Sequence, residues 1–150
     1  MKVKQLMTRP VETISPETPL RRVNQLMQRY RLNDLVVVDE KDEVKGIITF
    51  SDLYRLILPA YDEVMKDDSI WLLPETLENK VTGLIDKPVK EVMTKKVITV
   101  SEDDLAIKAG SVMTAHKIKE LPVVKNNKLV GVISYKDILW GFLMKNCKYF

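Results

Sequence analysis

Cysteine and histidine are almost absent from this sequence of 150 residues, which contains one of each. Cys147 alone cannot form an internal disulfide, and it is no basis for a metal site. His116 alone leaves little material for a histidine-based catalytic group or a zinc site. Five glycines and seven prolines are too few for a collagen-like or low-complexity chain. These shortages argue against most enzymes, and we expect no catalytic residues, no metal and no cofactor.

Long apolar runs are missing as well. Even the longest purely apolar runs are short, such as residues 35–38, so we expect no segment that crosses a bilayer. The first ten residues, MKVKQLMTRP, lack the apolar core of a signal peptide, which predicts a cytoplasmic protein. The content of hydrophobic residues is 45%, which excludes disorder, and the length allows one compact domain or two very small ones.

The net charge of +3 is too small to indicate nucleic-acid binding by itself. Residues 55–88 carry four basic and seven acidic side chains, so the basic surplus lies in the parts of the chain on either side. This surplus is compatible with an anionic small ligand, and also with a solvated basic surface. Nucleic-acid binding ranks lower, because the sequence has no platform of alternating aromatic and basic residues.

An internal repeat organises the chain. The segment VKQLMT at residues 3–8 returns as VKEVMT at 89–94, an offset of 86, and the same offset pairs Leu35 with Leu121. After one deletion the offset becomes 85, and Gly46 then pairs with Gly131. Because chance does not hold register over this length, the chain contains a duplicated unit. We expect residues 1–58 to form repeat 1, 59–88 an insert or linker, and 89–150 repeat 2.

Each copy predicts the order β-α-β-β-α. Strands are expected at 11–14 and 97–100, and helices that start near Ser15 and Ser101, where a hydroxyl precedes acidic residues. Their apolar faces would include Tyr30 and Leu105. The next elements of each copy are a buried strand, at 35–38 or 121–124, and a polar turn. A second strand follows, at 44–49 or 129–134, and then a helix, near 51–58 or 136–144.

The insert is expected to be partly helical, at 62–66 and 75–85. Residues 71–73 form a short apolar patch that is typical of a local core or a dimer contact. Trp140 and Phe142, in the last expected helix, would pack either within the chain or against a second module.

One repeated motif carries chemistry: Gly, two apolar residues, then Thr49 or Ser134, with Asp52 or Asp137 three residues later. It places a strand directly before a helix, where a hydroxyl and unpaired helical N–H groups favour phosphate. The carboxylate can accept hydrogen bonds from the vicinal diol of a ribose. The same spacing is also a helix capping box, and capping is compatible with ligand binding.

These motifs, the Met-Thr openings and the strands at 35–38 and 121–124 resemble a tandem cystathionine β-synthase (CBS) domain pair, or Bateman module. The resemblance covers nearly everything except the insert. It implies an α+β fold of two pseudo-symmetric repeats packed through their sheets. It also implies a stand-alone regulatory protein that is not an enzyme and that binds an adenosyl ligand in the cleft between the repeats.

The resemblance also assigns site residues. Asp52 and Asp137 would hold ribose hydroxyls, and four residues would reach phosphate: Thr49, Ser51, Ser134 and Lys136. The adenine at the Asp137 site would contact Thr8, Val11, Leu32 and Asn33, and the adenine at the Asp52 site would contact Thr94, Val97, Ile118 and Lys119.

The chain departs from nucleotide-sensing relatives by carrying an acid, Asp34 or Glu120, at the strand next to each expected site. An acid near phosphate oxygens lowers affinity, so AMP or ADP is favoured over ATP. Since Lys136 has no basic equivalent at Ser51, the Asp137 site is expected to bind phosphate more strongly.

Three alternatives remain in different classes. The ligand could be of the S-adenosylmethionine type; the chain could be a ligand-free interaction or dimerisation module whose motifs only cap helices; or it could bind nucleic acid. A homodimer and an unidentified protein partner are the expected assemblies.

Overall fold

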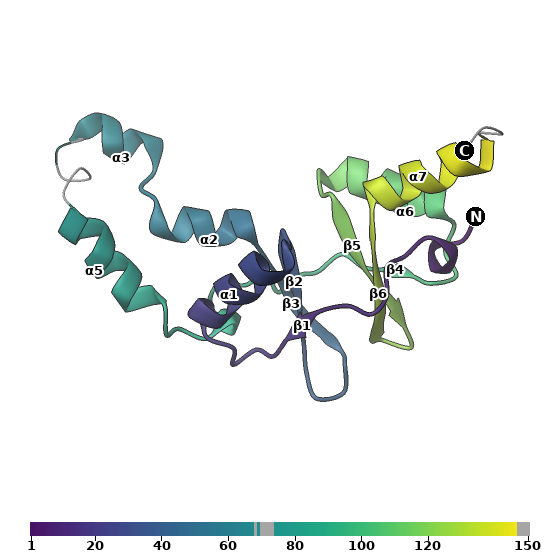
Figure 1. Ribbon diagram of the computed structural model, residues 1–150, viewed down its shortest axis with the longest axis horizontal. Helices are drawn as coiled ribbons and strands as arrows, with labels where there is room; N and C mark the ends of the chain where they lie inside the picture. Colours follow the sequence, from purple (N-terminus) through teal and green to yellow (C-terminus); the bar gives the residue numbers. More distant parts are fainter. Residues whose placement is uncertain (68, 70–73, 147–150) are drawn as a thin grey trace. The chain divides into compact units, whose positions relative to one another are not determined.

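The β-α-β-β-α order expected from the sequence is present in both copies of a computed structural model that describes residues 1–67, 69 and 74–146 (Figure 1). The apolar patch at 71–73 and Cys147 lie outside the described residues. In repeat 1 the elements are the 3-10 helix η1 (Val3–Gln5), β1 (Thr13–Ile14), α1 (Leu20–Tyr30), β2 (Asp34–Val38), β3 (Val44–Thr49) and α2 (Phe50–Ile57). The insert provides α3 (Tyr61–Lys66) and α5 (Pro74–Leu84), as its sequence suggested.

In repeat 2 the elements are η2 (Val89–Glu91), β4 (Val100–Ser101), α6 (Ala106–His116), β5 (Glu120–Lys125), β6 (Lys128–Ser134) and α7 (Tyr135–Asn146). Each copy forms one three-stranded sheet, in the order β1-β2-β3 or β4-β5-β6. The first strand of each sheet pairs in parallel with the second, and β5 pairs antiparallel with β6. The first strands are shorter than the sequence predicts, with two residues each.

The turn between β5 and β6 shows how the sequence sets the hairpin. Asn126 and Asn127 both adopt left-handed backbone angles, with φ of 50° and 63°. A two-residue turn with positive φ at both positions matches the right-handed twist of the strands that it joins, and asparagine tolerates this conformation well.

The predicted starts of the first helix in each repeat are wrong. Helix α1 begins at Leu20 and α6 at Ala106, not at the preceding serines. Ser15 instead closes a local turn, in which its N–H donates to Thr18 Oγ1 at 3.1 Å. Ser101 does the same with Asp104 Oδ2 at 3.0 Å. A side-chain turn of this kind competes with helix capping for the same residue types, so the sequence pattern fitted both.

Backbone groups from distant segments cap these helices instead. The Leu20 N–H donates to the Lys87 carbonyl at 3.0 Å, and the Ala106 N–H donates to the Met1 carbonyl at 2.9 Å. Each bond satisfies one of the amides that a helix start leaves unpaired. Because the acceptors are main-chain groups far away in the sequence, no local pattern could reveal them.

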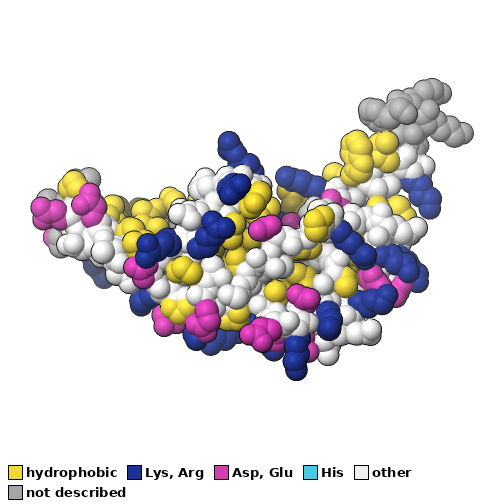
Figure 2. Space-filling view, turned by 60° about the horizontal axis from the view of Figure 1, so that its bottom comes forward, with side chains coloured by type: hydrophobic (Ala, Val, Ile, Leu, Met, Phe, Trp, Pro, Cys, Tyr) yellow, Lys and Arg dark blue, Asp and Glu magenta, His cyan; other side chains and the backbone are white. Residues whose placement is uncertain are grey.

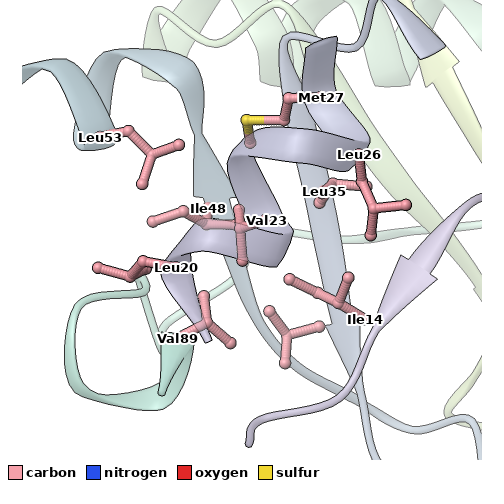
Figure 3. Close-up of a cluster of buried hydrophobic side chains, with 10 residues drawn as sticks. Ile14, Leu20, Val23, Leu26, Met27, Leu35, Ile48, Leu53 and Val89 are labelled. Atoms are coloured by element: carbon pink, nitrogen blue, oxygen red, sulfur yellow. The ribbon is translucent and has the colours of Figure 1, made fainter. Parts of the chain in front are cut away.

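The chain divides into two compact units that cut across the sequence repeats. Unit 1 comprises residues 1–12, 40–44 and 97–150, and unit 2 comprises residues 13–39 and 45–96. The opening segment of each repeat therefore belongs with the body of the other repeat. Val3 is fully buried in the core of unit 1. Its counterpart Val89 is fully buried in the core of unit 2, which Figure 3 shows.

The exchanged openings make matched contacts. In unit 1 the Val3 N–H donates to the Asp104 carbonyl at 2.9 Å, and Lys4 Nζ lies 2.8 Å from Asp103 Oδ1. In unit 2 the Val89 N–H donates to the Thr18 carbonyl at 2.8 Å, and Lys90 pairs with Glu17 at 2.5 Å. The repeated Val-Lys dipeptide thus supplies one buried side chain and one ion pair to each unit.

The glycine of the repeated motif is explained by the same exchange. A Cβ atom on Gly46 would overlap the side chain of Met93, and one on Gly131 would lie 2.6 Å from the Met7 sulfur. The methionine of each Met-Thr opening therefore packs directly over the glycine of the other repeat, where no larger residue fits without a shift.

Several large apolar side chains are exposed in the chain. Trp140 is 64% exposed on α7, and Phe142 is 36% exposed, so packing within the described part of the chain does not bury them. Tyr30 and Leu105, expected on buried helix faces, are exposed as well. Among the described residues, no helix has the length and apolar content needed to span a membrane.

Candidate functional site

The motif of unit 2 forms a reciprocal capping box at the start of α2. The Thr49 N–H donates to Asp52 Oδ2 at 2.9 Å, and the Asp52 N–H donates to Thr49 Oγ1 at 3.1 Å. This arrangement satisfies two amides that the helix start would otherwise leave unpaired. It also fixes the orientation of the Asp52 carboxylate. The other oxygen, Oδ1, lies 3.9 Å from Arg55 Nη1, at the edge of ion-pair distance.

The motif of unit 1 is built in the same way at the start of α7. Asp137 Oδ2 accepts hydrogen bonds from the Ser134 N–H and from Ser134 Oγ, both at 2.7 Å. Within the described part of the chain, all hydrogen bonds to this carboxylate go to Oδ2. The cap therefore leaves Oδ1 available as an acceptor. The same aspartate can thus cap the helix with one oxygen and bind a ligand with the other.

The helix starts offer fewer amides to a ligand than the sequence suggests. The Phe50 N–H donates to the Asn33 carbonyl at 2.7 Å, and the Tyr135 N–H donates to the Lys119 carbonyl at 3.1 Å. With the cap of Asp52, two of the first three amides of α2 are already bonded, which leaves the Ser51 N–H. A phosphate at this place would thus depend mainly on side chains and on the helix dipole.

A threonine from a Met-Thr opening lies beside each motif. In unit 1 the Thr8 N–H donates to the Val132 carbonyl at 2.8 Å, two residues before Ser134. In unit 2 the Thr94 N–H donates to the Ile47 carbonyl at 2.9 Å, two residues before Thr49. The exchange of openings therefore places matched threonines next to matched strand ends, and both threonines are exposed.

The predicted site residues are divided between the units. Unit 1 holds the Asp137 motif together with Thr8, Val11, Val97, Ile118 and Lys119, and unit 2 holds the Asp52 motif together with Leu32, Asn33 and Thr94. Within a unit, the backbone contact at each helix start comes from the residue before the buried strand, Asn33 for α2 and Lys119 for α7. The sequence had assigned these two residues to the opposite motifs.

The two groups differ in charge. The group in unit 1 contains two exposed lysines, Lys119 and Lys136, whereas the equivalent positions in unit 2 are Asn33 and Ser51. An anionic ligand therefore meets more positive charge at the Asp137 motif. Elsewhere basic and acidic side chains are interspersed, as on the face shown in Figure 2.

Sequence reasoning missed a buried carboxylate close to this group. Glu102 is 6% exposed and pairs with Arg9 Nη2 at 2.8 Å and with Lys125 Nζ at 2.6 Å. The hydrogen bond from Lys125, and then that from Arg9, hold the pKa of Glu102 below its ordinary value. The three residues are far apart in the sequence and follow no periodic spacing, so no sequence signal connects them.

Sequence reasoning also missed an apolar cavity of about 320 Å³ in unit 2. It lies among the helices α1, α2 and α5 and the residue after α5, and seven of its ten lining residues are aliphatic, including Leu53, Leu56 and Val81. The cavity does not include any residue of the two motifs.

Comparison with known proteins identifies relatives of several kinds. The chain is 30% identical over 139 residues to inosine-5'-monophosphate dehydrogenase from Methanocaldococcus jannaschii, and this match covers 92% of the chain but 23% of the dehydrogenase. The chain thus spans about a quarter of the length of that enzyme.

Two solved structures share the fold at low sequence identity. CBSX2 in complex with AMP is 19% identical with a TM-score of 0.76, covering 97% of this chain and 98% of that one. The CBS domain pair of protein MJ0100, in complex with 5'-methylthioadenosine and S-adenosyl-L-methionine, is 23% identical with a TM-score of 0.70 and the same coverage. The family model of the CBS domain matches residues 3–59 and 89–142, the two copies found in the sequence, and the chain therefore belongs to the CBS domain family as a tandem pair.

Proposed function

We propose that the chain is a regulatory CBS pair that binds an adenosyl ligand, AMP or ADP in preference to ATP, and that has no catalytic activity of its own. The observation that carries this proposal is the duplicated helix start. In both copies one carboxylate oxygen of Asp52 or Asp137 holds the cap, so that the other can face a ligand.

The chemistry of each helix start suits a nucleotide. A carboxylate oxygen held in place by its own cap can accept hydrogen bonds from the hydroxyls of a ribose. The positive end of the helix dipole favours a phosphate at both helix starts. In unit 2 the Thr49 hydroxyl accepts from the Asp52 N–H and can donate its own proton to a phosphate. In unit 1 the Ser134 hydroxyl donates to Asp137, and the exposed Lys136 supplies a positive charge. The ligands of the two structural neighbours, AMP in one and 5'-methylthioadenosine with S-adenosyl-L-methionine in the other, support an adenosyl ligand as a class.

Regulation would follow from differential binding. A ligand shifts a conformational equilibrium only when it binds one state more tightly than the other. In this chain the openings that carry Thr8 and Thr94 belong to the opposite repeat from the motifs that they flank. A ligand that contacts both a threonine and its neighbouring motif would therefore link segments from the two repeats.

Thermal unfolding of ligand-stripped protein tests this proposal directly. AMP, ADP, ATP, S-adenosylmethionine and NADH would each be added to the wild type and to Asp52→Ala and Asp137→Ala. A ligand at 100 times its dissociation constant adds roughly 2.7 kcal/mol, a shift of several degrees.

The variants separate binding from capping. A further variant, Asp137→Asn, distinguishes the two roles of this residue. If Asp137 only caps the helix, the variant lowers the melting temperature of the ligand-free protein. If Asp137 also accepts from the ribose, the variant loses the increase in melting temperature that the ligand causes. We expect AMP or ADP to give a larger shift than ATP, and Asp137→Ala to abolish most of it. The absence of a shift with every compound, in folded protein, would overturn the proposal.

A second candidate function is self-association through α7. Leu139, Trp140 and Leu143 follow a helical spacing and are all more than half exposed. Contiguous exposed apolar residues mark interaction surfaces in soluble proteins. Sedimentation of the wild type and of Trp140→Glu tests this candidate: a dimer that becomes a monomer supports it, and a wild type that is monomeric at high concentration contradicts it.

A further inference from the structure

Glu102 occupies a special place in unit 1. It is the buried charged residue of the described chain, and each of its carboxylate oxygens accepts from a different cation. Arg9 comes from the segment that follows the first opening, and Lys125 lies at the end of β5. Hydrogen bonds between ionised groups are shorter and stronger than neutral ones, and they restrict both partners. We name these three residues the Glu102 clamp.

Among the described residues, unit 2 has no carboxylate at the position that matches Glu102. At an offset of 86, the position of Glu102 is occupied by Pro16, that of Arg9 by Lys95, and that of Lys125 by Asp39. Proline cannot accept a side-chain hydrogen bond. Asp39 pairs with Lys45 at 3.3 Å.

The clamp is directly connected to the Asp137 motif. Arg9 follows Thr8, whose N–H donates to Val132 at 2.8 Å and whose carbonyl accepts from the Val132 N–H at 3.3 Å. Val132 is two residues before Ser134, which caps α7 together with Asp137. A short path of backbone bonds therefore leads from the buried carboxylate to the helix start.

Because these segments lie close together, a small movement of the Thr8 segment would be felt at β6. An ideal Cβ on Gly131 would lie 3.1 Å from the Thr8 carbonyl oxygen, so the opening passes close over the strand. Loss of the ion pair at Arg9 would free the residue next to Thr8, so that the end of the opening would be held by the main-chain bonds of Thr8 and by the packing of Met7 over Gly131.

We propose that Glu102 is a positioning residue: through Arg9 it holds the Thr8 segment against β6 and so preorganises the Asp137 motif for its ligand, a role that unit 2 lacks. The consequence for ligand binding rests on the proposed function, whereas the holding of Thr8 does not. A preordered segment costs less entropy when a ligand binds. The Asp137 motif is therefore the tighter site for reasons beyond the charge of Lys136.

Amide hydrogen exchange in the ligand-free protein tests the holding of Thr8. Glu102→Gln keeps the shape of the side chain but removes its charge, and Arg9→Gln removes only the partner next to Thr8. We expect both variants to raise the exchange rate of the Thr8 amide about tenfold through local opening. The matched amide of Thr94 serves as an internal control and is expected to stay within about twofold.

Two further variants separate positioning from a general loss of charge pairs. Glu17→Gln makes the same substitution at an exposed ion pair of unit 2 and should leave the Thr8 amide unchanged. Arg9→Lys keeps a cation beside Glu102 and should restore protection. Unchanged exchange at Thr8 in Glu102→Gln, or an equal rise at Thr8 and Thr94, would overturn the proposal.

Titration with AMP then tests the consequence for binding. In the Asp52→Ala background, where only the Asp137 motif is intact, Glu102→Gln should weaken AMP binding roughly five- to tenfold. In the Asp137→Ala background the same substitution should leave binding unchanged within twofold. If the wild type binds none of the adenosyl compounds, the proposed function fails, while the exchange of Thr8 still decides whether Glu102 holds the segment. Equal weakening in both backgrounds would contradict positioning at the Asp137 motif.

Discussion

The two units build nearly the same backbone from different side chains. In unit 2 the buried face of α1 includes Leu20, Val23 and Met27, and in unit 1 the matched positions of α6 are Ala106, Ala109 and Met113. Ile138 of α7 is buried in unit 1, as its counterpart Leu53 of α2 is in unit 2. The duplicated chain thus keeps the buried positions of this helix while the volume of the side chains at two of them differs.

Other features hardly differ between the units. The capping box, the glycine under the methionine and the backbone bonds of the openings appear in both, with closely similar distances. These features fix the position of the helix start and of the threonine beside it. The comparison teaches that the duplicated sequence keeps the geometry of the candidate site and varies the core and charges around it.

Truncation of the valines in the two openings should give the largest difference in stability between the units. Val3→Ala and Val89→Ala each remove fully buried methyl groups, at a cost of roughly 2 kcal/mol. Although Val3 belongs to repeat 1, its loss should raise hydrogen exchange mainly in β5 and β6, and Val89→Ala should act mainly on β2 and β3. An effect of each variant on its own repeat would contradict the exchange of openings.

A methyl group on the motif glycines should give a smaller and unequal effect. At Gly131 the added Cβ meets the Thr8 backbone as well as Met7, whereas at Gly46 its nearest neighbours are all atoms of the flexible Met93 side chain. We expect Gly131→Ala to destabilise by about 1–3 kcal/mol and Gly46→Ala by less. Urea denaturation of the two variants measures the difference, and equal losses would show that the backbone contact does not matter.

Acidification should destabilise unit 1 slightly more than unit 2, and this difference should be smaller than those above. Hydrogen bonds from lysines lower the pKa of Glu102, Asp103 and Asp104, all in unit 1. A carboxylate whose folded pKa is depressed stabilises the protein above its unfolded pKa of about 4, and this contribution is lost as the pH falls through the folded pKa. Exchange protection should therefore weaken in unit 1 before unit 2 below about pH 4. Simultaneous loss in both units would contradict this order.

Swapping the residues that precede the two aspartates compares the AMP affinities of the two motifs directly. Lys136→Ser should weaken AMP binding at the Asp137 motif a few-fold, because an exposed charge contributes modestly, and Ser51→Lys should strengthen it at the Asp52 motif by a similar factor. Calorimetric titration in the Asp52→Ala and Asp137→Ala backgrounds measures each motif separately. Adenosine, which lacks the phosphate, is the control ligand and should respond to neither substitution.

The sequence predicts those parts of the structure that local pattern and repetition determine. The β-α-β-β-α order and the capping of α2 by Thr49 follow from residues close together in the chain, and the repeat follows from the match at an offset of 86. The starts of α1 and α6 could not be predicted, because main-chain groups of Lys87 and Met1 complete them.

The candidate site was predictable to the same extent. The aspartates and the hydroxyls that cap with them follow from spacing, whereas the neighbours of each motif depend on tertiary contacts. The exchange of openings, the backbone bond from Lys119 to α7 and the Glu102 clamp join residues tens of positions apart. Such contacts arise only once the sheets and helices have packed.

We propose that the chain has two similar but unequal adenosyl sites, each at the start of a helix. The most direct measurement is the change in amide chemical shifts as AMP is added to the ligand-free protein. We predict that Thr8, Ser134 and Asp137 shift at low AMP concentration and that Thr94, Thr49 and Asp52 shift only at higher concentration. Shifts confined to other residues, such as those around the cavity between α1, α2 and α5, or no shifts at all, would contradict the account.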